Sequence, residues 1–170
     1  MGAINLTLVT FVARSSNGVM HMAWFQLASE IDVFQPKKLF KGTDFLAHSG
    51  TQSLEGSTTV GWFDKGDYLT YTSANFGSSG TTKGIRITYA KQNTGGRAEI
   101  RLGSGPDGKV IGELKPAHTS SWYKYLTAYI DIEEGVEGIH DITVVAQGGG
   151  GVLNLQAFQL ADFSERSEVY

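Results

Sequence analysis

Cysteine is absent from this 170-residue chain, and only three prolines occur in it. The lack of cysteine excludes disulfide bridges, thiol nucleophiles and every metal motif that needs a thiolate. It leaves the compartment open, because many secreted bacterial proteins contain no disulfide. Charged residues make up 18% of the chain and the net charge is −3. Neither a nucleic acid nor an anionic membrane surface is therefore the expected partner.

Long hydrophobic runs are also missing, so no segment is expected to span a membrane. Residues 1–7 lack the basic and apolar regions of a signal peptide, and a signal for secretion would have to lie outside this chain. Hydrophobic residues nevertheless make up 41% of the chain. That share and this length predict a folded domain with a core of its own.

Apolar residues alternate with a period of two along most of the sequence, and glycine is plentiful at 22 residues. The alternation predicts strands at 5–13, 83–91, 97–103 and 141–147. Glycine-rich turn signals lie between them, at 77–80, 93–96, 105–108 and 148–151. Short strands at this spacing indicate an all-β fold, a β-sandwich of jelly-roll type built from antiparallel strands. No segment predicts a helix.

Residues 7–28 align without gaps on residues 140–161, and both copies end in Phe-Gln-Leu-Ala. We interpret residues 1–28 as the closing strand pair of a preceding or partial module, 29–163 as a complete module and 164–170 as a tail. Another interpretation stays open, because two hairpins of one sandwich share the same alternation. A lone strand pair has bare edges, so it would extend the sandwich, replace its counterpart or form a homodimer by strand exchange.

Motifs of common enzymes are not found. The sequence has neither a His-Glu-x-x-His nor a Gly-x-Ser-x-Gly pattern, nor a glycine-rich phosphate loop. Asp64 and Asp67 have the residue type of a glycosidase pair, but Asp-Lys-Gly-Asp favours a turn between two strands. The chain is therefore expected not to be an enzyme.

Two alternatives to a binding function stay open. One is a small carbohydrate-active β-sandwich enzyme, whose titratable groups could come from Tyr71, Tyr89, Arg86 and Arg101. The other is an assembly domain that acts through strand exchange by residues 1–28.

From about residue 40 to 162 the sequence resembles a family 6 carbohydrate-binding module. The resemblance is carried, in order, by the stretches 49–56, 60–71, 97–102 with 111–112, and 148–160. It implies a non-catalytic β-sandwich that accompanies polysaccharide-degrading enzymes, with a sugar cleft formed by loops at one end. The resemblance also implies an extracellular location and a catalytic glycoside hydrolase domain as a partner.

The resemblance further implies the residues that bind sugar. Trp62 and Trp122 would hold the two faces of a sugar ring, and Asn154 would hydrogen-bond it from below. A glutamate that often adds a contact corresponds to Glu55, although strict spacing from Gln52 places Leu54 there. The ligand is expected to be a polysaccharide or oligosaccharide, and the sequence does not specify which one.

Structural calcium is a further feature of the family. Asp44 and Asp162 lie near the positions where such modules hold the ion, and are the candidate ligands. Lys41 stands where an acidic residue is usual, and a lysine is unfavourable for a cation that needs oxygen donors.

Overall fold

The computed structural model describes residues 37–162, which form eleven strands and no helix. This confirms the expectation of an all-β chain for these residues, and no helix among them is long and apolar enough to cross a membrane. The strands are β1 Leu39–Lys41, β2 Ala47–Ser49, β3 Gln52–Ser53, β4 Val60–Gly61, β5 Tyr68–Asn75, β6 Gly84–Ala90, β7 Arg97–Leu102, β8 Val110–Leu114, β9 Tyr125–Asp131, β10 Ile139–Gln147 and β11 Asn154–Ala161.

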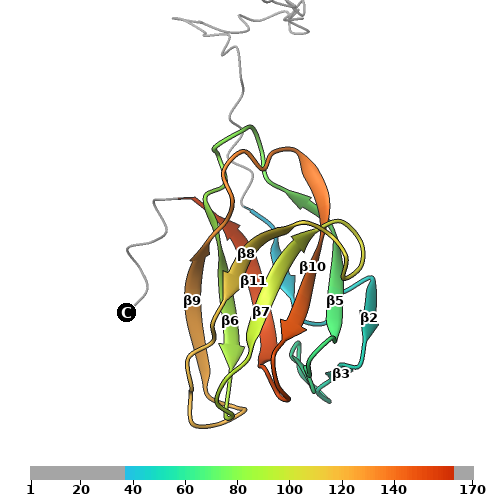
Figure 1. The fold of residues 1–170 in the computed structure, drawn as a ribbon, viewed down its shortest axis with the longest axis vertical. Helices are drawn as coiled ribbons and strands as arrows, with labels where there is room; N and C mark the ends of the chain where they lie inside the picture. The colour runs from blue at the N-terminus through green and yellow to red at the C-terminus, as the bar shows by residue number, and fades with distance from the viewer. Residues whose placement is uncertain (1–36, 163–170) are drawn as a thin grey trace, which may run out of the picture. The chain divides into compact units, whose positions relative to one another are not determined.

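The strands form two sheets that face each other (Figure 1). One has the order β3-β4-β11-β6-β9, with β1 also paired to β11, and the other has the order β2-β5-β10-β7-β8. Every pairing is antiparallel. The prediction of an antiparallel β-sandwich is therefore confirmed.

The alternation seen in the sequence places one face of each strand in the core. On β6, Ile85, Ile87 and Tyr89 are at most 2% exposed, whereas Arg86 and Thr88 between them are half-buried. Aromatic rings join the two sheets at one point, where the Phe158 ring stacks on Phe40 and meets Tyr71 edge-on, each at 4.8 Å between centroids. Burial of this apolar surface is the main stabilising contribution to the sandwich.

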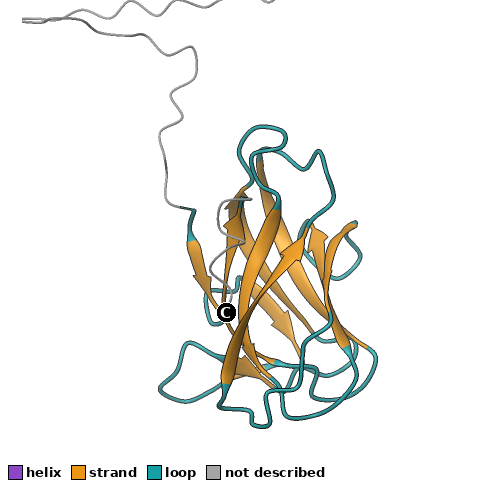
Figure 2. Cartoon of the chain, turned by 90° about the vertical axis from the view of Figure 1, so that its left-hand side faces the viewer, coloured by secondary structure: helices purple, strands orange, loops and turns teal. Residues whose placement is uncertain are grey.

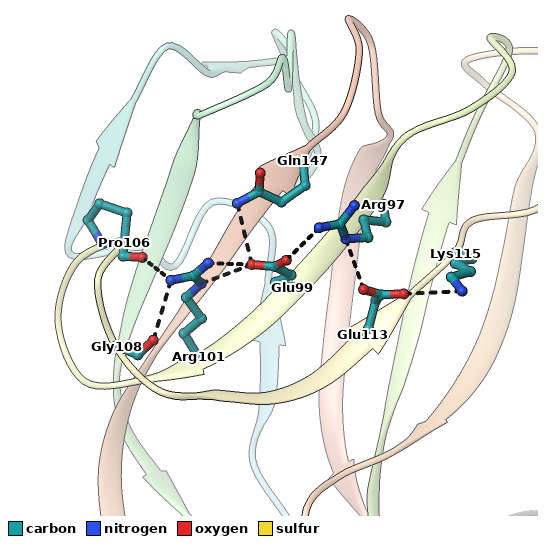
Figure 3. A network of polar contacts seen from close by, with 8 residues as sticks. All are labelled: Arg97, Glu99, Arg101, Pro106, Gly108, Glu113, Lys115 and Gln147. Carbon is teal, nitrogen blue, oxygen red and sulfur yellow. Dashed lines mark hydrogen bonds and ion pairs between the residues drawn. The ribbon is translucent and has the colours of Figure 1, made fainter.

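The outer face of the five-stranded sheet carries an ion-pair network (Figure 3). Glu99 is 7% exposed and bonds to Arg97, Arg101 and Gln147. Burial by itself raises the pKa of the Glu99 carboxyl, but hydrogen bonds and charges from the two arginines outweigh it and lower that pKa below its usual 4.5. Arg101 also donates to the carbonyls of Pro106 and Gly108, which fastens the loop between β7 and β8 to the sheet.

Loops gather at the two ends of the sandwich, as Figure 2 shows. At the lower end in Figure 1, four connections come together: residues 62–67 after β4, 91–96 after β6, 115–124 after β8 and 148–153 after β10. The strand pair expected at 1–28, its proposed homodimer and the tail 164–170 lie outside the described residues.

Candidate functional site

A cavity of about 490 Å³ opens among these four loops. Its volume lies within the range of small-molecule binding sites. The lining residues combine aromatic rings, amides, glycines, one carboxylate and one leucine, and they are Leu54, Trp62, Asp64, Asn93, Trp122, Tyr123, Gly150, Gly151 and Asn154. Trp62, Trp122 and Asn154, which the resemblance selected, are thus brought together in one cavity.

Trp62 directly follows β4 and leaves the sheet in a left-handed backbone conformation, with φ at 53°. A bulky residue seldom adopts this conformation, which costs about 1–2 kcal/mol. Its side chain is 56% exposed, while its neighbours Gly61 and Phe63 are buried. The left-handed backbone at Trp62 directs its indole away from the core and into the cavity wall.

Trp122 lies in the long loop between β8 and β9, which a second left-handed residue, Ser120, helps to shape. Its indole is half-buried and rests close to Gly151. A Cβ at Gly151 would lie 3.0 Å from the Cη2 atom of Trp122, and the φ of Gly151 is 59°. Both the space and the backbone therefore require glycine at this position.

Asn154 begins β11 and forms the polar floor between the two tryptophans. It is 7% exposed, and its Nδ2 donates to the carbonyl of Trp122 at 3.0 Å. This bond uses one of the two N–H groups of the amide, and Oδ1 is the atom of Asn154 that can accept a hydrogen bond from a ligand. A Cβ at Gly61 would lie 2.7 Å from this Oδ1, so the absence of a side chain at Gly61 makes room for the amide.

Asp64 and Asn93 also line the cavity, and the sequence did not identify them as binding residues. Asp64 accepts a hydrogen bond from the amide of Gly151 at 2.5 Å, and its backbone N–H donates to Asp67. The turn expected at this point is therefore present, and one carboxylate of it faces the cavity. Asn93 Nδ2 donates to the carbonyl of Gly150 at 3.4 Å. Both residues sit in glycine-containing turns, and only contacts across the chain place them at the site.

Other residues named from the sequence lie elsewhere. Glu55 is exposed and is not among the lining residues, whereas Leu54 lines the wall, as the strict spacing from Gln52 indicated. Tyr71 and Tyr89 are at most 1% exposed and belong to the core, and Arg101 is held by Glu99. The titratable cluster considered for an enzyme is therefore not assembled on an open face by these residues.

The predicted calcium ligands are separate from the cavity. Asp44 is exposed, and its Oδ2 accepts the backbone N–H of Lys41 at 2.9 Å. Within residues 37–162, no three His, Cys, Asp or Glu side chains lie close enough to share a metal ion. Because calcium takes six to eight oxygen donors, these side chains do not by themselves make up its site. Asp44 and Asp162 stay predicted ligands of calcium.

The chemistry of the cavity suits an amphipathic ring. Indole and phenol rings offer large apolar faces with few rotatable bonds, and Tyr123, at 78% exposed, extends that surface beside Trp122. Asn154 and Asp64 supply hydrogen-bonding groups at fixed positions, because both are held by backbone contacts. A ligand ring with apolar C–H faces and hydroxyls at its edge could stack on the aromatic rings and form hydrogen bonds with these polar groups.

The sequence and the fold are both similar to those of known carbohydrate-binding modules. A family model described as carbohydrate binding module (family 6) matches residues 41–162. Among solved structures, a family 6 carbohydrate-binding module from Clostridium cellulolyticum in complex with xylose is 30% identical, with a TM-score of 0.67. That match covers 74% of this chain and 98% of the other.

Two further structures are similar. A β-1,3-glucan binding module of the same family from Bacillus halodurans is 26% identical with a TM-score of 0.64, over 74% of this chain and 96% of that one. A family 43 arabinoxylan arabinofuranohydrolase from Bacillus subtilis, in complex with cellotetraose, is 23% identical with a TM-score of 0.62. This last match covers 75% of this chain and 27% of the hydrolase, and at that identity it shows the fold alone.

Proposed function

Since the chain belongs to the family 6 carbohydrate-binding modules, we propose that it binds polysaccharide or oligosaccharide without catalysis, in the cavity between Trp62 and Trp122. One observation carries the proposal. Two indoles from loops far apart in sequence and the buried amide of Asn154 meet in a single open cavity. Trp62 and Tyr123, which are 56% and 78% exposed, both line this cavity, and exposed aromatic surface that is gathered at one place is typical of a binding site.

Each group has a role in this proposal. The C–H faces of a pyranose ring stack on Trp62 and Trp122, and Asn154 Oδ1 accepts a hydrogen bond from a ring hydroxyl. Asp64 offers a second acceptor at the rim. Two ring contacts and a few hydrogen bonds correspond to about −4 to −7 kcal/mol, which is a dissociation constant of about millimolar to micromolar.

A module of this affinity is useful when it is joined to another domain. Tethering raises the local concentration of a catalytic domain on the polymer without any new chemistry. We therefore include in the proposal a partner glycoside hydrolase and a location outside the cell, where polysaccharides are degraded. The similarity to part of a family 43 hydrolase is compatible with such an arrangement.

The test is affinity electrophoresis in native gels that contain xylan, laminarin, agarose or a soluble cellulose derivative. Wild-type protein should be retarded by at least one polymer, and Trp122→Ala should migrate as in a gel without polymer. Leu46→Ala is a matched control, because Leu46 is a large apolar side chain, 68% exposed, that does not line the cavity. This variant should be retarded like the wild type.

Two outcomes contradict the proposal. One is a folded wild-type protein that no polymer retards. The other is a Trp122→Ala variant that is retarded as strongly as wild type, which would place binding elsewhere on the molecule. The same gels distinguish binding from hydrolysis, because an enzyme would leave a cleared zone in the stained polymer.

A further inference from the structure

Lys91 is a lysine in the interior of the protein. It immediately follows β6 and is 1% exposed, although lysine is among the residues least often fully buried. Within residues 37–162 no carboxylate forms an ion pair with its ammonium group. A buried cation without a counter-ion is costly, so its contacts should explain why it is there.

The ammonium group of Lys91 donates to the carbonyl of Val152 at 2.6 Å. Val152 lies in the glycine-rich loop, one residue after Gly151 and two before Asn154. The N–H of Val152 donates in turn to the carbonyl of Phe63, next to Trp62. The peptide units on both sides of Val152 are thus fixed, one to Lys91 and the other to the segment that carries Trp62.

The backbone of Lys91 holds a second loop. Its N–H donates to the Thr119 hydroxyl at 2.8 Å, and its carbonyl accepts the N–H of Thr119 at 2.7 Å. The Thr119 hydroxyl also lies 2.9 Å from the carbonyl of Ser121, the residue before Trp122. Lys91 therefore stands where the loop of Trp122 and the loop of Gly151 and Asn154 meet.

We propose that Lys91 is a positioning residue of the binding cavity, whose ammonium group holds the Val152 carbonyl and so fixes the loop on which Trp122 rests and which leads into Asn154 at the start of β11. The inference rests on the function proposed above for this cavity. A bond from an ammonium group to a carbonyl is stronger than one between neutral groups, and the long stem of lysine reaches the loop from the end of β6. Burial lowers the pKa of the Lys91 ammonium from its usual 10.5, in agreement with its place in the interior.

The test compares Lys91→Met with Tyr71→Phe. Methionine keeps an apolar stem of similar length but has no donor. Tyr71→Phe also removes one buried hydrogen bond, to the carbonyl of Gly42 at 2.8 Å, and Tyr71 does not line the cavity. Affinity for the polymer that retards wild type is measured at a temperature where urea titration shows each variant to be folded. We expect Lys91→Met to bind at least about fivefold more weakly, and Tyr71→Phe to bind as wild type.

A second readout needs no glycan. Amide hydrogen exchange followed by NMR reports on the N–H groups of Gly151 and Val152, which bond to Asp64 and Phe63. In Lys91→Met both amides should exchange faster, relative to the core amides of β6, than in wild type or Tyr71→Phe. Lys91→Arg, which keeps charge and donors, should restore protection and affinity at least in part.

Each outcome is decisive. If Lys91→Met binds like wild type, or loses no more affinity than Tyr71→Phe, the inference is overturned. If wild type itself binds no glycan, the proposed function fails, and the exchange of Gly151 and Val152 still decides whether Lys91 holds the loop. Should Lys91→Met not fold, Lys91→Leu gives the same comparison, because leucine is also apolar and has no donor.

Discussion

The position of the Asn154 amide can be tested with one methyl group. Gly61→Ala would place a Cβ 2.7 Å from Oδ1 of Asn154, inside ordinary van der Waals contact. The φ of Gly61 is not in the left-handed region, so alanine adds no backbone strain there. The remaining close neighbour, Cδ2 of Leu54, lies at 3.5 Å, an ordinary contact. The substitution therefore acts mainly on the amide.

The expected loss of glycan affinity in Gly61→Ala follows from this geometry. The amide must move by about 0.5–1 Å to restore normal contact, which breaks the hydrogen bond that it would offer to a sugar hydroxyl. A neutral hydrogen bond contributes about 1 kcal/mol, so glycan affinity should fall about fivefold. Overpacking should also lower the free energy of unfolding by about 1–3 kcal/mol. Titration calorimetry with an oligosaccharide of the retarding polymer measures the affinity, and urea denaturation measures the stability.

A double-mutant cycle makes the test specific. Asn154→Ala alone should weaken binding at least as much as Gly61→Ala, because it also removes the donor that holds the Trp122 carbonyl. In the Asn154→Ala background, Gly61→Ala should change affinity less than about twofold, since the atom with which it collides is gone. Equal losses in both backgrounds would refute the reasoning, because the effect would then not pass through the Asn154 amide.

Two predictions concern stability rather than binding. The lowered pKa of Glu99 means that its ion pairs stabilise the fold above about pH 4.5 and lose that contribution as the pH falls below it. Glu99→Gln should therefore be less stable than wild type at neutral pH, by about 1–3 kcal/mol, and the difference should shrink towards about pH 3 in urea titrations. A difference that does not change with pH would contradict this reading. Tyr71→Phe should lower the free energy of unfolding by about 1–3 kcal/mol, because it leaves the buried carbonyl of Gly42 without the hydroxyl. Equal urea midpoints for this variant and wild type would disprove the prediction.

Much of the fold was predictable from local sequence. The strands expected at 83–91, 97–103 and 141–147 correspond to β6, β7 and β10 within two residues at each end. The period of two in apolar residues determines such strands, since alternate side chains of a strand point to opposite faces. Glycine-rich stretches predicted the loops, because glycine adopts the backbone conformations that tight turns need. Trp62, Trp122 and Asn154 could be selected because the motifs around them resemble a known family.

Only the tertiary structure decided how these residues form a site. Asp64 looks like a turn residue in the sequence, yet it bonds to Gly151, 87 positions away. The sequence left two neighbours open, Glu55 by residue type and Leu54 by spacing, and the structure shows that Leu54 lines the wall.

Lys91 is the clearest example of a feature that could not be predicted from the sequence. In the sequence it is one polar residue at the end of a strand, a place where lysine is usually exposed. Its burial and its bond to Val152, 61 positions later, arise when β6 and β11 pair and bring their end loops together. The sequence by itself determined β6, β7 and β10 and the glycine-rich turns, because these depend on neighbouring residues. The cavity and its support depend on contacts between segments far apart in the chain, which exist only once the two sheets have packed.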